Sequence, residues 1–221
     1  MLRKTIRKST CLRGLFNLIL CWPIPLLAYS AGPPPAAADA SRLNNIGVAL
    51  MNQQLTEKAL AKFDAAHAAD PSSVVPLANK GIALLYLQRL PEAEDALKQA
   101  AVLDPNNARA WYALGLAHLN AGNPKLAIED LQHVVKIDPS NADAHYFMGS
   151  FYLSLNDYPH AKEEYENALR LNPVHASAQF GLARALQRSG EIDASREHLK
   201  RFQELTQIGR ASCRERVLMP V

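Results

Sequence analysis

Apolar side chains between residues 40 and 207 recur at the three-to-four-residue spacing that places them on one face of a helix. Each stretch of this kind is followed, after a few polar residues, by a second one. One such pair is carried by Trp111, Leu114, His118, Ala127, Leu131 and Val134. The pattern predicts a series of paired amphipathic helices and therefore an all-α fold.

These helix pairs repeat with a period of 34 residues. Prolines mark the period at Pro71, Pro105, Pro139 and Pro173. Small residues keep the same phase at Gly47, Gly81, Gly115, Gly149 and Ala183. The period divides the region into five units, 40–73, 74–107, 108–141, 142–175 and 176–207. Because one helix pair cannot bury its apolar face alone, we expect neighbouring pairs to stack.

In the third and fourth units, fixed positions of the period hold large apolar residues, small residues and proline. They are Trp111, Leu114, Gly115, Ala127 and Pro139 in the third unit, and Met148, Gly149, Tyr152, Ala161, Tyr165, Ala168 and Pro173 in the fourth. This pattern resembles the tetratricopeptide repeat family over residues 40–207. The resemblance implies a right-handed superhelical solenoid of helix-turn-helix repeats with a concave inner surface. Lys80, His118 and Gln179 depart from the family pattern, and we expect looser packing around them.

The resemblance also implies where a partner binds. In this family a groove is lined by the face of each first helix that lies opposite its packing glycine. Carried over by position, the groove residues are Asn44, Asn79, Ile82, Tyr86, Arg109, Tyr112, Leu116, Asn120, Tyr146, Phe147, Phe180, Arg184 and Arg188. Because tyrosine and arginine often anchor interfaces, we expect an aromatic ladder that holds an extended peptide or a short helix. The ladder is expected to consist of Tyr86, Tyr112, Tyr146, Phe147 and Phe180. The alternative is that Phe147 and Phe180 pack against a neighbouring unit.

Charge, cysteine content and motifs narrow the function further. Residues 40–207 contain 16 Lys and Arg against 19 Asp and Glu, and no cysteine. This acidic balance argues against nucleic-acid binding, and the missing cysteines exclude a disulfide framework or thiol chemistry in this region. The histidines form no i, i+4 pair, and there is no phosphate-binding loop or zinc-protease motif. We expect a non-enzymatic adaptor without a cofactor or metal, whose partner is another polypeptide.

Residues 1–30 have the layout of an export signal. A basic run precedes an apolar stretch, 14–29, that is too short and too broken by proline for a typical membrane span. We expect cleavage after Ser30, with a retained anchor or lipid attachment at Cys21 as alternatives. The Pro/Ala-rich residues 31–39 are expected to form a stiff extended linker. The signal and repeats are typical of a bacterial protein of the periplasm or cell envelope, with membrane contact only through an uncleaved N-terminal segment.

The last residues have a different character. Residues 208–217 read IGRASCRERV, which resembles the translation of a widely used sequencing-library adapter, and a natural basic tail is the alternative. We treat residues 208–221 as a non-native tail and expect the natural sequence to differ after Gln207. A second functional hypothesis follows. In it, the repeats are the N-terminal arm of a larger exported protein whose active domain follows residue 207.

Overall fold

The computed structural model describes residues 35–218, and all regular secondary structure in that range is helical. The ten helices of this range are α1 (Pro35–Asn52), α2 (Thr56–Ala69), α3 (Val74–Tyr86), α4 (Leu90–Leu103), α5 (Ala108–Asn120), α6 (Pro124–Ile137), α7 (Ala142–Ser154), α8 (Tyr158–Leu171), α9 (Ala176–Arg188) and α10 (Ile192–Leu218). The expected export signal, residues 1–30, lies outside the described residues, as do the last three residues of the expected non-native tail. None of the helices described is long and apolar enough to cross a membrane.

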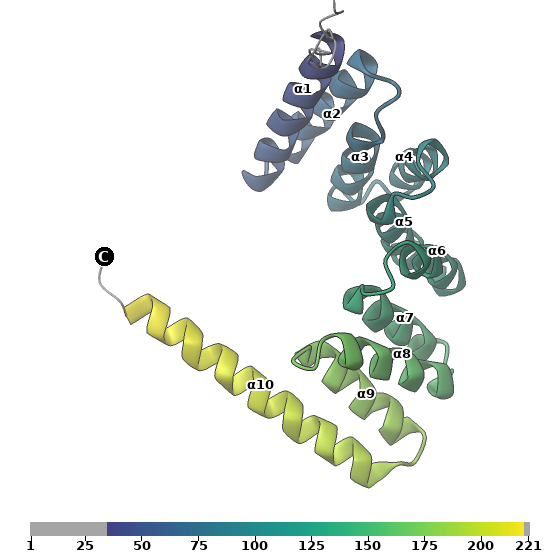
Figure 1. Cartoon of the computed structure of the whole chain (residues 1–221), viewed down its shortest axis with the longest axis vertical. Coiled ribbons are helices and arrows are strands. Elements are labelled where there is room, and N and C mark those ends of the chain that lie inside the picture. Colours follow the sequence, from purple (N-terminus) through teal and green to yellow (C-terminus); the bar gives the residue numbers. More distant parts are fainter. Residues whose placement is uncertain (1–34, 219–221) are drawn as a thin grey trace, which may run out of the picture. The chain divides into compact units, whose positions relative to one another are not determined.

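The helices form consecutive pairs, which Figure 1 shows along the colour gradient. Each helix packs against its neighbours in sequence, and first helices also contact the first helix of an adjoining unit, α1 with α3, α3 with α5 and α7 with α9. First helices therefore share an inner layer, and second helices lie behind them. The predicted all-α solenoid of helix-turn-helix repeats is confirmed.

Local sequence sets where the second helices begin and end. Proline occupies the first or second helical position of α4, α6 and α8, where its missing N–H has no intrahelical partner to lose. The residues that end these helices are Asp104, Asp138 and Asn172, and each precedes a proline. A residue before proline is disfavoured in the helical region, so the helix stops there.

The first helix begins earlier than the sequence analysis predicts. Helix α1 starts at Pro35, so residues 35–39 are helical and do not belong to an extended linker. Alanine has the highest helix propensity, and three alanines follow Pro35. Proline is well tolerated at the first helical position, and these local preferences extend the helix beyond the repeat boundary.

The turn inside every unit contains a residue with positive φ at the same position of the period. These residues are Gln54 (60°), Gln88 (59°), Gly122 (78°), Asn156 (61°) and Gly190 (85°). In the first unit, the N–H of Leu55 then donates to the carbonyl of Leu50 at 2.9 Å, which closes the end of the helix. Only glycine enters this backbone region without a steric penalty.

Replacing Gln54 by glycine is expected to raise the free energy of unfolding by about 0.5–1 kcal/mol, because relief of left-handed strain exceeds the added chain entropy of glycine. Urea unfolding followed by circular dichroism measures the change. The control is Gln53→Gly in the same turn, where φ is not positive. That variant is expected to be destabilised, and an equal loss in both variants would contradict the prediction.

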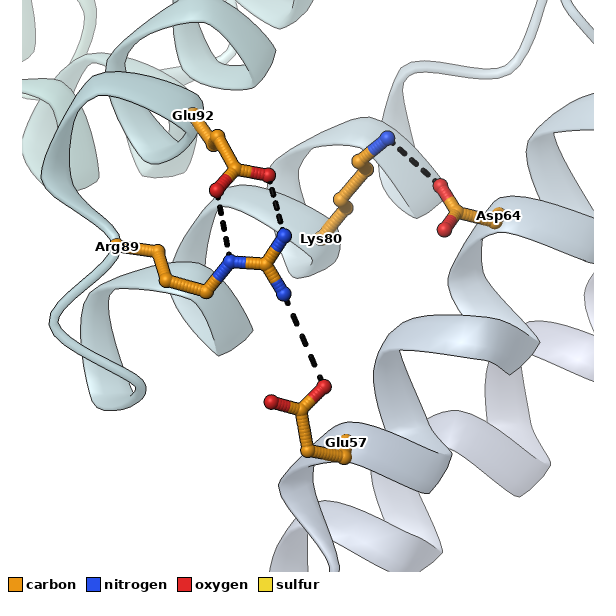
Figure 2. Close-up of polar contacts among 5 residues, drawn as sticks. All are labelled: Glu57, Asp64, Lys80, Arg89 and Glu92. Atoms are coloured by element: carbon orange, nitrogen blue, oxygen red, sulfur yellow. Dashed lines mark hydrogen bonds and ion pairs between the residues drawn. The ribbon is translucent and has the colours of Figure 1, made fainter.

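Lys80, which replaces an apolar residue of the repeat pattern, pairs with an acidic residue of the first unit. Its Nζ lies 2.7 Å from Oδ1 of Asp64 on α2 (Figure 2). Beside it, the Nε of Arg89 donates to Glu92 at 2.8 Å, and a terminal guanidinium nitrogen lies 3.8 Å from Glu57 on α2. Both basic side chains thus link the first two units at the surface, where each such pair contributes only about 0.2–1 kcal/mol.

The histidines His118 and His145 are both buried. The Nδ1 of His118 on α5 lies 2.5 Å from Oδ2 of Asp130 on α6, and its Nε2 lies 3.4 Å from Glu94 on α4. The Nδ1 of His145 on α7 lies 2.7 Å from Glu164 on α8. Both histidines therefore connect a first helix to the second helix of the same unit.

Candidate functional site

A pocket of about 560 Å³ lies between α3 and α5. It is lined by Ile82, Leu85, Tyr86, Gln88, Arg109, Tyr112, Ala113, Leu116 and Asn120. Six of the predicted groove residues come together here, namely Ile82, Tyr86, Arg109, Tyr112, Leu116 and Asn120. We call this site the α3–α5 pocket. Its two walls belong to different repeat units.

Helical spacing explains why these side chains share one surface. Arg109, Tyr112, Leu116 and Asn120 follow one another at intervals of three or four residues, so they line one face of α5. Asn120 lies eleven positions after Arg109, which corresponds to about 16 Å along the helix axis. The side chain of Asn107 fixes the start of the helix by accepting a hydrogen bond from the N–H of Ala110 at 3.1 Å. The pocket is therefore an elongated trough along α5.

The lining combines apolar walls with a few polar groups. Ile82, Leu85 and Leu116 supply aliphatic surface, and Tyr86 is 72 % exposed. Arg109 is the one charged lining residue, and it forms no ion pair with any residue in the described range. Such a surface can bury apolar side chains of a ligand and attract a negative charge at one position.

Tyr112 lines this pocket as a neutral phenol. Burial, with smaller contributions from Asp143 and Tyr146, raises the pKa of its phenol to about 12. The hydroxyl therefore stays protonated at neutral pH and can donate or accept a hydrogen bond.

The predicted aromatic ladder is interrupted. Tyr112 meets Phe147 edge-on at 5.7 Å between ring centroids, and Phe147 meets Tyr146 at 5.0 Å. Phe180, however, lies 5.2 Å from Phe202 of α10. Phe147 thus packs against the preceding unit, as the alternative interpretation expected, whereas Phe180 packs against the second helix of its own unit. Tyr112, Tyr146 and Phe147 form one cluster across α5 and α7.

Two asparagines of the predicted groove bind each other. The Nδ2 of Asn79 donates to Oδ1 of Asn44 at 2.7 Å, and only 4 % and 8 % of these residues are exposed. Because a buried amide needs a partner, this bond joins α1 to α3. Their side chains are engaged in packing between the first two units and lie outside the α3–α5 pocket.

The two arginines of α9 also lie apart from the pocket lining. Arg184 and Arg188 are exposed, and the guanidinium carbon of Arg184 lies 5.9 Å from the ring centroid of Phe180. A cation over an aromatic face is held weakly at an exposed site. These arginines form a separate basic surface on the fifth unit.

The sequence analysis left three lining residues out of its predicted groove. Leu85 and Ala113 lie at the edge of the predicted helix face, where the inner layer meets the core. Gln88 lies in the turn after α3, at one of the repeated positive-φ positions. The repeat period reveals that turn position, but only the structure places its side chain at the pocket. Within residues 35–218, no group of three or more His, Cys, Asp or Glu is placed to hold a metal ion.

Comparisons with known proteins agree with this architecture. A family model described as "Tetratricopeptide repeat" matches residues 79–142 and 148–207, which together exceed half of the chain. A MamA structure from Desulfovibrio magneticus RS-1 is 25 % identical and has a TM-score of 0.70, with 76 % of this chain and 96 % of that chain covered. No curated protein matches the sequence.

Two further solved structures share the fold at lower identity. YrrB, described as a protein of this repeat type with an unusual peptide-binding site, is 21 % identical with a TM-score of 0.65, covering 81 % of this chain and 93 % of that chain. PilF of Pseudomonas aeruginosa is 21 % identical with a TM-score of 0.71, covering 77 % and 78 %. At this identity the likeness concerns the fold alone.

Proposed function

Because the chain belongs to the tetratricopeptide repeat family, we propose that it is a scaffold whose α3–α5 pocket binds a segment of another polypeptide. The fold of this family implies a role in protein–protein interaction, and we propose that the role is non-enzymatic. The observation that carries the proposal is the lining of the pocket, where apolar side chains from two units surround an exposed tyrosine and an arginine. The described peptide-binding site of YrrB is consistent with it.

The size of the pocket suits a short polypeptide segment. Its volume of about 560 Å³ falls within the range of about 300–1,000 Å³ that is usual for ligand sites. An extended chain advances about 3.3 Å per residue, so a trough of about 16 Å along α5 accommodates roughly five residues. Several side chains of a partner could then contact both walls at once.

Tyr86 is the position that tests the proposal most directly. A photo-reactive amino acid in place of Tyr86 is expected to cross-link a distinct polypeptide in the cells that produce the protein. The matched control carries the same probe at Val102 on α4, which is 81 % exposed and does not line the pocket. Equal cross-linking at both positions, or none at residue 86, would contradict binding in the pocket.

A second variant separates binding from folding. Tyr86→Ala is expected to reduce capture of the cross-linked partner at least about tenfold and to leave the helical circular dichroism signal intact, because the residue is exposed at the end of α3. Tyr112 and Tyr146 are less suitable positions. Both rings pack against neighbouring aromatic residues, so their replacement would disturb the fold as well as the pocket.

For the place of action, we propose export to the periplasm or envelope of a bacterium. The proposal rests on the basic and apolar layout of residues 1–30, which is typical of an export signal. A fusion of residues 1–40 to a reporter enzyme that is active only after export tests it. Reporter activity that depends on the basic run is the expected result, and an inactive fusion that is stably produced would contradict export.

A further inference from the structure

Arg109 gives the α3–α5 pocket a charge that its surroundings do not neutralise. The cations Lys80 and Arg89 of the second unit are paired with acidic residues, whereas Arg109 is exposed and forms no ion pair within the described part of the chain. Asp143 on α7, the next first helix, lies 3.1 Å from His175 on α9. A ligand carboxylate at Arg109 would therefore meet a guanidinium that keeps its full hydrogen-bonding capacity.

The apolar part of the trough begins further along α5. Leu116 lies seven residues after Arg109, which corresponds to about 10 Å along the helix axis. Ile82 and Leu85 of α3 line the same pocket. Because an extended chain advances about 3.3 Å per residue, an apolar side chain that reaches Leu116 is about three residues from a carboxylate at Arg109.

The polar lining favours an extended segment over a helix. Tyr112, Gln88 and Asn120 line the pocket beside its apolar walls. The amide nitrogen of Gln88 already donates to the carbonyl of Leu85 at 3.4 Å. An extended chain has unpaired backbone N–H and C=O groups that such side chains can satisfy, whereas a helix satisfies its own. The neutral polar residues Tyr112 and Asn120 therefore suit an extended backbone.

We infer that the segment bound in the α3–α5 pocket is extended and carries a carboxylate side chain, placed at Arg109, about three residues from a bulky aliphatic side chain placed at Leu116. This inference rests on the proposed function, since it describes the ligand of the same pocket. The partner segment is therefore expected to contain an acidic residue and an apolar residue with two residues between them.

Fluorescein-labelled peptides test the inference with the full chain. The probe is Ser-Gly-Asp-Ala-Ala-Leu-Gly-Ser, compared with a version in which Asn replaces Asp and with one of equal composition in which Asp and Leu are adjacent. Fluorescence anisotropy is expected to give about tenfold tighter binding for the probe than for the Asn peptide. The advantage is expected to shrink as salt is raised, because the pairing is electrostatic.

Two variants of the protein test whether Arg109 causes the preference for the Asp peptide. Arg109→Gln is expected to bind the Asp and Asn peptides equally. The matched control is Lys125→Gln, which removes one positive charge from an exposed residue of α6 that does not line the pocket. That variant is expected to retain the tenfold preference. A preference that survives Arg109→Gln would overturn the assignment.

The outcomes also distinguish the inference from the proposed function. Equal binding of the Asp and Asn peptides to the native protein, weakened for both by Tyr86→Ala, overturns the carboxylate and leaves the pocket as a polypeptide site. Equal binding of the spaced and adjacent peptides overturns the three-residue spacing. If no peptide binds at millimolar concentration, the inference fails, and cross-linking at residue 86 decides the proposed function separately.

Discussion

Replacing Tyr165 by alanine is expected to lower the free energy of unfolding by about 4 kcal/mol, the largest effect of a single substitution that we predict. The side chain is 2 % exposed. Its ring lies between Gly149 of α7 and Gly181 of α9, so closely that a Cβ at Gly149 would lie 2.9 Å from the ring and one at Gly181 closer still. Three helices from two units therefore meet on this ring, and alanine would leave a cavity among them.

The Tyr165→Phe variant separates packing from hydrogen bonding. The phenol oxygen lies 3.0 Å from Oγ of Ser150, so phenylalanine removes one hydrogen bond and keeps the ring. We expect a loss of about 1 kcal/mol for this variant. Urea unfolding followed by circular dichroism measures both variants. A loss for alanine no larger than that for phenylalanine would contradict the ring's role at this junction.

The second large effect concerns the buried pair of His118 and Asp130. His118→Leu is expected to cost about 3 kcal/mol, because Asp130, only 6 % exposed, would keep a buried carboxylate without its hydrogen-bond donor. The loss arises from the uncompensated charge and not from the shape of leucine. Leu84 occupies the position equivalent to His118, 34 residues earlier, and is completely buried.

A double variant tests this explanation. Ala96 is the equivalent of Asp130 in the second unit, so His118→Leu combined with Asp130→Ala recreates a pair that the chain already contains as Leu84 and Ala96. Replacing a buried ion pair by apolar residues is often neutral or stabilising. We therefore expect the double variant to recover most of the stability lost in His118→Leu. A double variant as unstable as the single one would show that packing, and not the buried charge, is responsible.

The cost of His118→Leu is also expected to depend on pH. Burial raises the pKa of the Asp130 carboxyl, and the hydrogen bond from His118 partly opposes this rise. A carboxyl whose pKa is raised by folding contributes stability below its ordinary pKa of about 3.9, and this contribution is lost as the pH rises through the raised value. In the His118→Leu variant, no hydrogen bond from His118 opposes the rise in the pKa of Asp130. Urea unfolding should therefore show a smaller cost of the substitution at pH 4 than at pH 7, and equal costs would contradict the assignment.

Much of the fold follows from the spacing of small residues and prolines. The 34-residue period identifies the helix pairs because each unit must place the same close contact and the same helix end at the same position. The start of α1 at Pro35 does not follow from the period. It depends on local alanine propensity before the first unit, which a repeat comparison does not consider.

The candidate site was only partly predictable because one repeat position can face either a ligand or a neighbouring unit. Asn44 and Asn79 occupy predicted groove positions, yet their amides bind each other. Phe180 is equally placed by the repeat pattern, but Phe202 on α10 provides a packing partner for its ring. The direction and partner of such side chains depend on neighbouring residues that a positional rule does not include. Tyr86 and Arg109 were predictable because no described neighbour binds their side chains.

The location of the α3–α5 pocket at a joint between two units has a mechanical consequence. In a solenoid, curvature is the sum of small rotations between adjacent repeats, and each joint acts as an elastic element. The rotation between the second and third units sets the width of the trough, so a bound segment favours one value of that rotation. By reciprocity, any load that bends or straightens this joint changes the affinity for the segment. The fraction of pockets that hold a segment would then report how strongly the solenoid is bent at this joint.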